Sequence, residues 1–157
     1  FSELKKGTTP IHSAVAQGSL QEVQCVLHGR PGAVHDVNHL GQTPLHFAAR
    51  DGHVDIMACL LDARATLSPP NNAGSTPLHW AAGKGQDAAA AWLIAARAEV
   101  HARNTEKGTP LHLAVISGHV TVAARLFAEG AGISGHTASG HTMLGLAASF
   151  EHEAATS

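Results

Sequence analysis

The stretch Gly41–His53, which reads GQTPLHFAARDGH, decides the fold because it returns along the chain at a nearly fixed interval. Its threonine, Thr43, has counterparts from Thr9 to Thr142 at successive intervals of 34, 33, 33 and 33 residues, and we call these residues the marker threonines. Self-similarity at such a period is typical of a solenoid, in which one small unit repeats and stacks on its neighbours. We therefore expect an elongated stack of repeats.

Each copy contains the signals of two short helices. Thr43 is a good N-cap residue, and Pro44 suits the first helical position because proline has no N–H to leave unpaired. Gly52 ends this first helix, since glycine takes the left-handed conformation at little cost. A second apolar run from Val54 predicts a second helix that ends near Ala63. Two short helices cannot bury both of their faces alone, so neighbouring copies must stack on them.

The period and the Thr-Pro-Leu-His motif are similar to those of the ankyrin repeat, and the resemblance covers nearly the whole chain. It implies an all-α fold, an ankyrin-repeat solenoid of stacked helix-turn-helix units with β-turn fingers. We expect a single domain over residues 1–157, with about ten helices and no sheet beyond paired turns at the fingers. The repeats are expected at about residues 5–37, 38–70, 71–103, 104–136 and 137–157, the last of them incomplete.

Several positions depart from the regular repeat. Ser13 and Glu22 are polar where the family prefers apolar residues, which favours an N-terminal capping repeat. The linker over residues 29–34 holds the extra residue of the 34-residue interval, so we expect a loop of altered shape. Lys107 stands where other repeats have the turn glycine, which predicts a locally different fourth finger. In the fifth repeat only the first helix, Met143 to about Phe150, is expected to be well formed.

Two further rows of residues belong to the loops. An asparagine lies five residues before the marker threonine in three repeats, where it can bond to its own backbone in the turn. These residues are Asn38, Asn71 and Asn104. Arginine occupies the family's helix-ending glycine position at Arg64 and Arg97, and we expect Arg30 to correspond to them.

The composition limits the class of partner. A formal net charge of -2 and a pI near 6.7 describe a nearly neutral surface, which does not favour nucleic acid or anionic lipid. The longest apolar run, Ala88–Ala96, is too short to span a membrane, and the N-terminus lacks the pattern of a signal peptide. The chain begins without methionine and ends partway through a repeat, so we expect a piece of a longer protein, monomeric by itself.

Cys25 and Cys59 hold equivalent places in the second helices of adjacent repeats. Stacked helices lie about 8–10 Å apart, which exceeds the Cα separation of about 7 Å that a disulfide tolerates. We therefore expect two free thiols, as is typical of a reducing compartment. The expected location is intracellular, in the cytoplasm, with the nucleus as the alternative.

Neither a metal site nor a catalytic site is indicated. Of the thirteen histidines, four belong to the Thr-Pro-Leu-His motif, where the resemblance implies that they bridge turns by hydrogen bonds. These are His12, His46, His79 and His112, while His53 and His119 follow helix-ending glycines. His35 and His39 form the remaining close pair, but the spacing is not that of a zinc site. Nucleophile-elbow, zinc-protease and phosphate-loop motifs are absent, so we expect no cofactor and no enzymatic activity.

The resemblance places the partner-binding surface in a concave groove, at fixed offsets from the marker threonines. The expected binding residues are His39, Leu40, Gln42, Phe47, Arg50, Asp51, Asn72, Ser75, Trp80, Lys84, Thr105, Glu106, Ile116 and Ser117. Aromatic and arginine side chains are enriched among interface hot spots, so Phe47, Trp80 and Arg50 are the expected anchors. The competing interpretation for the two aromatic residues is plain packing between first helices.

Three functions follow as hypotheses. The first is a protein-interaction module that binds a protein or peptide through the concave groove and the finger tips, with a partner that the chain does not identify. The second is an intramolecular scaffold or oligomerisation segment of a larger enzyme or channel. The third is a substrate of the ankyrin-directed asparaginyl hydroxylase, because Leu93–His101 resembles its target with histidine at the acceptor place.

Overall fold

The computed structural model describes residues 7–131, which form four pairs of helices. The first helices of the pairs are α1 (Pro10–Ala16), α3 (Pro44–Asp51), α5 (Pro77–Lys84) and α7 (Pro110–Ile116). The second helices are α2 (Leu20–Gly29), α4 (Val54–Asp62), α6 (Asp87–Ala95) and α8 (Val120–Ala128). A short 3₁₀ helix, η2 (Pro31–His35), follows α2. No residue from 7 to 131 lies in a strand, which confirms the all-α fold; the fifth-repeat predictions lie outside the described residues.

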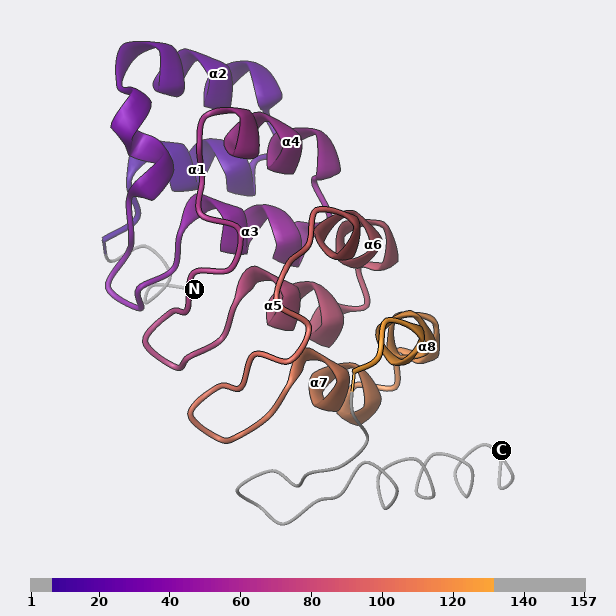
Figure 1. The fold of residues 1–157 in the computed structure, drawn as a ribbon. Coiled ribbons are helices and arrows are strands. Elements are labelled where there is room, and N and C mark those ends of the chain that lie inside the picture. Colours follow the sequence, from indigo (N-terminus) through magenta and orange to yellow (C-terminus); the bar gives the residue numbers. More distant parts are fainter. Residues whose placement is uncertain (1–6, 132–157) are drawn as a thin grey trace.

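The helix pairs stack in order along the chain (Figure 1). The first helices form one row, the second helices form another, and the loops that join successive pairs project from the row of first helices. The first helices contact one another more extensively than the second helices do, so the stack curves toward the first helices. We call the loops over residues 36–43, 69–76 and 102–109 the fingers. The concave face is the surface formed by the fingers and by α3, α5 and α7.

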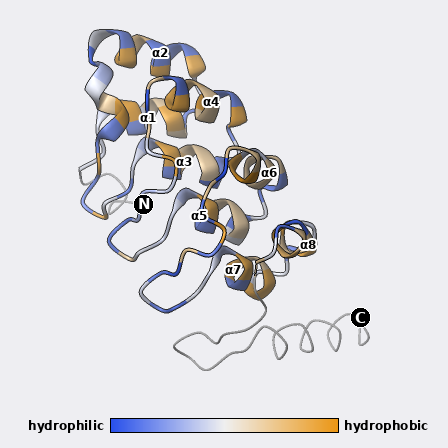
Figure 2. Cartoon of the chain, viewed as in Figure 1, coloured by the Kyte–Doolittle hydropathy of each residue, from blue (hydrophilic) through white to orange (hydrophobic). Residues whose placement is uncertain are grey.

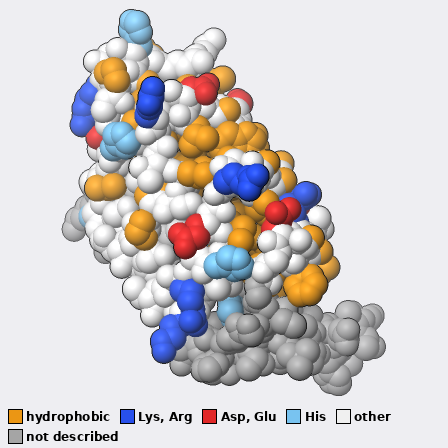
Figure 3. All heavy atoms as spheres, in the orientation of Figure 1, with side chains coloured by type: hydrophobic (Ala, Val, Ile, Leu, Met, Phe, Trp, Pro, Cys, Tyr) orange, Lys and Arg blue, Asp and Glu red, His pale blue; other side chains and the backbone are white. Residues whose placement is uncertain are grey.

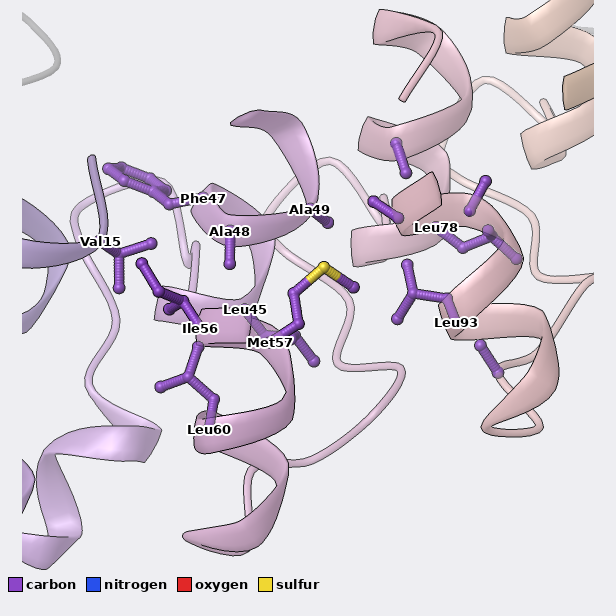
Figure 4. Close-up of a cluster of buried hydrophobic side chains, with 14 of the residues drawn as sticks. Val15, Leu45, Phe47, Ala48, Ala49, Ile56, Met57, Leu60, Leu78 and Leu93 are labelled. Atoms are coloured by element: carbon purple, nitrogen blue, oxygen red, sulfur yellow. The ribbon is translucent and has the colours of Figure 1, made fainter. Parts of the chain in front are cut away.

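Small and aliphatic side chains fill the interior. Ala48 and Ala49 of α3 are fully buried, and their size lets neighbouring first helices approach closely. Leu45 of α3 and Ile56 and Met57 of α4 belong to the same cluster of buried side chains (Figure 4). The helices therefore carry most of the hydrophobic residues, while the fingers are largely hydrophilic (Figure 2).

The helix ends follow the sequence signals. α3 begins at Pro44 after its cap Thr43 and ends at Gly52, which takes the left-handed conformation with φ 75°. α4 ends at Asp62, next to the predicted position. In the first pair, Ser13 and Glu22 are exposed, as expected of an end repeat. The loop of altered shape after α2 is also confirmed, since it forms η2.

The asparagine turns are confirmed in all three fingers, and they explain one wrong expectation. Asn104 Oδ1 accepts hydrogen bonds from the backbone N–H groups of Glu106 at 3.0 Å and Gly108 at 2.9 Å. Lys107 has φ 61°, close to the 72° of Gly41 and Gly74 in the other fingers. The finger over residues 102–109, which leads into the fourth repeat, thus has the regular turn, because the bonds to asparagine hold a lysine in a conformation that glycine prefers.

The arginine row is only partly as expected. Arg64 and Arg97 adopt left-handed φ values of 71° and 72°, as residues in the helix-ending glycine position do. Arg30 has φ -147°, so its expected correspondence with them is wrong. The extra residue of the first linker leads the chain into η2 instead, and Arg30 donates two hydrogen bonds, of 2.9 and 2.8 Å, to the carboxylate of Asp36.

Both cysteines are free thiols, as the helix spacing predicts. Cys25 is exposed on α2, and Cys59 is half-buried on α4. Burial raises the pKa of the Cys59 thiol, which disfavours its reactive thiolate form.

Candidate functional site

The concave face is built on a hydrogen-bonded histidine in each first helix. In α3, His46 Nδ1 accepts from the backbone N–H of Thr43 at 3.1 Å and lies 3.0 Å from its hydroxyl. His46 Nε2 lies 2.9 Å from the carbonyl oxygen of Ser75 in the next finger. Because an N–H only donates and a carbonyl only accepts, the ring is neutral and its proton is on Nε2. His46 therefore ties the start of α3 to the following finger.

The same arrangement recurs in the neighbouring repeats. His79 Nδ1 accepts from the Thr76 N–H at 3.0 Å, and Nε2 donates to the carbonyl of Gly108 at 3.0 Å. His12 Nε2 donates to the carbonyl of Gln42 at 2.8 Å. The turn-bridging role is confirmed in these three repeats. Burial lowers the pKa of His12, His46 and His79, and lowers that of His46 to about 4, so the rings are structural and neutral near pH 7.

In the second repeat the concave face is closed. Phe47 is only 4% exposed and packs edge-to-face on the ring of His12, with 5.0 Å between the ring centroids. The guanidinium carbon of Arg50 lies 4.7 Å from the centroid of the Phe47 ring. Arg50 also donates two hydrogen bonds, of 2.8 and 2.9 Å, to Asp51, and this bonding raises the pKa of Arg50. Both charges are thus already paired within the chain.

Burial excludes two predicted residues from direct contact with a partner. Phe47 is covered as described, so packing between first helices explains it better than an anchor role does. Gln42 is 2% exposed, and its side-chain oxygen accepts a hydrogen bond of 2.8 Å from Asn38. Sequence offsets identified the position of Gln42 correctly but not the inward direction of its side chain.

In the third repeat the concave face is hollowed. A cavity of about 240 Å³ lies between the finger over residues 69–76 and the first helices α5 and α7. Its lining residues are Asn71, Ala73, Ser75, His79, Trp80, Gly83, Lys84 and Leu113. The structure thus brings together three of the predicted binding residues, Ser75, Trp80 and Lys84. Trp80 is half-buried, whereas Lys84 is exposed and makes no ion pair with any residue from 7 to 131.

The other predicted residues lie along the fingers and at the end of α7, outside this cavity. Leu40 and Ile116 are large apolar side chains with exposed fractions of 40% and 50%. Asn72 Nδ2 donates to the carbonyl of His39 at 3.0 Å, which joins one finger to the next. Thr105 Oγ1 donates in the same way to the preceding finger, to the carbonyl of Ala73 at 3.2 Å. Glu106 and Ser117 are exposed.

Two features lie beyond the predicted binding residues. Gly83 and Leu113 also line the cavity, and the repeat offsets indicate both, because Gly83 corresponds to Arg50 and Leu113 to Phe47 and Trp80. A second hollow, also of about 240 Å³, lies between the η2 region and the loop after α4, and it includes Val34, Val37 and Pro69 among its lining residues. The sequence feature that indicates this second hollow is the irregular 34-residue interval between the first two marker threonines.

Residues 7–131 contain neither a candidate metal site nor a helix that could span a membrane. Within the described part of the chain no three His, Cys, Asp or Glu side chains are grouped closely enough to hold a metal ion. Asp36, between His35 and His39 in the sequence, is held by Arg30. None of the helices described is both long and apolar enough to cross a membrane. Charges of both signs are interspersed on the face in Figure 3, where hydrophobic side chains gather near α4 and α6.

Comparisons with known proteins agree with this geometry. A family model described as ankyrin repeats in three copies matches residues 11–104, and a model of the single ankyrin repeat matches residues 107–136. A search of curated proteins finds no match to the chain. The two matched segments cover all four helix pairs of the structure.

Proposed function

The chain belongs to the ankyrin-repeat family, and from that premise we propose that it binds a protein or peptide partner through its concave face and finger tips. Ankyrin repeats are in general protein-interaction modules. A fold alone does not fix a function, so the proposal for this chain rests on its surface.

The supporting observation is the mixture of exposed groups on the concave face. Leu40 on the first finger and Ile116 at the end of α7 have exposed fractions of 40% and 50%, whereas Leu45, Leu78 and Leu111 of the first helices are buried. Lys84, which has no ion-pair partner among residues 7–131, and the half-buried indole of Trp80 add a cation and an aromatic ring to this face. An apolar centre with polar groups around it is the usual makeup of a protein-binding surface.

The test is to identify a partner by cross-linking and mass spectrometry, and then to titrate it against variants of both faces. Lys84→Ala and Trp80→Ala should weaken binding, the second by about tenfold or more, because central aromatic residues contribute most to interfaces. The matched controls are Asp62→Ala on α4 and Arg125→Ala on α8, which should leave the affinity unchanged. Loss of binding in these controls, with no effect of the concave variants, would show that the concave face is not the binding surface.

The scaffold and hydroxylase hypotheses make different predictions for the same sample. Self-association measured by sedimentation, abolished by Trp80→Ala, would favour an oligomerisation segment over a partner-binding module. A mass increase of one oxygen at His101, after expression with the hydroxylase, would favour a modification substrate. We expect a monomer of unchanged mass.

A further inference from the structure

We propose that the cavity beside Trp80 is the specificity pocket of this chain, and that it receives one apolar side chain of a partner peptide whose neighbouring carboxylate pairs with Lys84. This inference rests on the proposed function, because it names the chemistry of the ligand for the same face. It commits to an extended peptide segment of a protein.

The size of the cavity favours a single side chain. Its volume of about 240 Å³ is below the range of about 300–1,000 Å³ that is usual for pockets that hold cofactors or drug-sized ligands. The apolar part of its wall is formed by Ala73 from the finger, Trp80 from α5 and Leu113 from α7. One aliphatic or aromatic side chain could contact all three of these residues there.

Two polar groups of the wall, the side-chain oxygen of Asn71 and the ring of His79, already have partners within the chain. Asn71 Oδ1 accepts from the N–H groups of Ala73 at 2.9 Å and Ser75 at 3.0 Å. Both ring nitrogens of His79 are engaged, one by Thr76 and the other by Gly108. A polar ligand group that entered this cavity would lose its hydrogen bonds to water and find few free hydrogen-bond partners in the wall. An apolar group has no such hydrogen bonds to lose.

Gly83 is the second, independent observation. Glycine destabilises a helix interior relative to alanine, and Gly83 has no left-handed φ that would require it. A Cβ atom built at this position would meet Leu113 Cβ at 3.8 Å and Cδ1 at 4.0 Å, which are ordinary contacts. The fold therefore does not need a glycine here. What the missing side chain provides is open space beside Trp80.

The second repeat shows what a side chain does at this position. Arg50 is the counterpart of Gly83, and its guanidinium covers Phe47 while Asp51 neutralises it. In the third repeat the counterpart of Asp51 is Lys84, so the aromatic ring is uncovered and the charge has no partner among residues 7–131. An uncovered ring beside an unpaired cation fits a ligand with an apolar group and a carboxylate.

The experiment uses the full chain with Trp92→Phe. This substitution leaves Trp80 as the single tryptophan of the chain, so the tryptophan fluorescence reports on the cavity. A displayed library of random short peptides is selected against it, and the enriched peptides are titrated by the fluorescence of Trp80. We expect enriched sequences with a large apolar residue adjacent to Asp or Glu. Gly83→Ala should weaken their binding by about tenfold, as one methyl group does in a tight apolar pocket, while the protein stays at least as stable.

Lys84→Glu tests the charge and Arg125→Glu is its control, because it changes the net charge equally on the second-helix side. Lys84→Glu should weaken binding by about fivefold or more, and less so at high salt, whereas Arg125→Glu should not. The inference is overturned if no peptide is enriched, or if Gly83→Ala and Lys84→Glu leave binding unchanged. In the latter case, loss of binding in Ile116→Asp would preserve the concave face as the binding surface. Insensitivity to every concave substitution would overturn the proposed function as well.

Discussion

The second and third repeats share one framework and differ in the surface built on it. In the second repeat Phe47 is buried under Arg50, and the charges of Arg50 and Asp51 satisfy each other. In the third repeat Trp80 borders an open cavity beside Gly83. Two residues in the last turn of the first helix, Arg50 and Asp51 in one repeat and Gly83 and Lys84 in the other, thus separate a closed surface from a hollowed one.

The framework itself is nearly identical in the two repeats. His46 and His79 each lie within 3.0 Å of a carbonyl oxygen in the next finger, and Gly41 and Gly74 both have φ 72°. All of these groups are satisfied inside the stack. The comparison shows that the two repeats keep the same internal hydrogen bonds while their surface residues differ, so the surface of a repeat can change without disturbing its fold.

The largest effect is expected from removing the histidine bridge of the third repeat, which the second repeat shares. His79→Ala should lower the free energy of unfolding by about 3 kcal/mol, because it leaves a cavity, removes the partner of the Thr76 N–H and removes one of the two hydrogen bonds to the Gly108 carbonyl. Urea denaturation measures this, and His46→Ala should behave alike. The control His28→Ala, exposed on α2, should stay within about 0.5 kcal/mol. A loss below about 1 kcal/mol in both repeats would contradict a framework role.

Acid should weaken all the histidine bridges together. Burial lowers the pKa of His46 to about 4 in the folded chain, against 6.5 for an ordinary histidine. Below pH 6.5 the unfolded state therefore binds a proton that the folded state refuses, so stability is complete above that pH and falls toward pH 4. This group alone should remove about 2 kcal/mol by pH 5, and the lowered pKa values of His12 and His79 act in the same direction.

Urea midpoints at pH 7 and pH 5 check this prediction. His46→Gln removes one titrating group, so its stability should depend less steeply on pH over this range than that of the unaltered chain. A midpoint that is equal or higher at pH 5 would show that the bridges do not couple folding to protonation.

A smaller effect should sharpen the comparison at the fingers. Lys107→Gly should raise the free energy of unfolding by about 0.5–1 kcal/mol, because glycine tolerates the left-handed φ of 61°. Gly74→Ala, in the preceding finger, should do the opposite, since its Cβ would approach backbone atoms of Asn104 and Thr105 at 3.1 Å. Thermal denaturation of the two variants decides the point: destabilisation by Lys107→Gly would mean that the lysine side chain holds the finger in place.

The sequence predicts the framework well because every signal in it is local or periodic. Thr43, Pro44 and Gly52 mark helix ends within a few residues, and repetition confirms them in neighbouring copies. The expectations for Arg30 and Lys107 are wrong for physical reasons. At Arg30 an inserted residue changes the path of the chain, and at Lys107 hydrogen bonds to asparagine fix the turn in its regular shape.

The candidate site was less predictable, because offsets along the repeat do not give the direction or burial of a side chain. Gln42 and Phe47 lie at expected positions but are buried by contacts with Asn38 and with His12 and Arg50. The cavity arises from residues of two helices and a finger, so no single repeat contains it.

The most direct test transfers the surface of the second repeat to the third. Gly83→Arg with Lys84→Asp, in the Trp92→Phe background, should place an arginine over Trp80 as Arg50 lies over Phe47. The free energy of unfolding should change by less than about 1 kcal/mol, since the framework is untouched. Acrylamide quenching of Trp80 is the measurement. We predict that the double variant lowers the quenching constant at unchanged fold, whereas an unchanged quenching constant, or loss of the folded state, would contradict the separation of framework from surface.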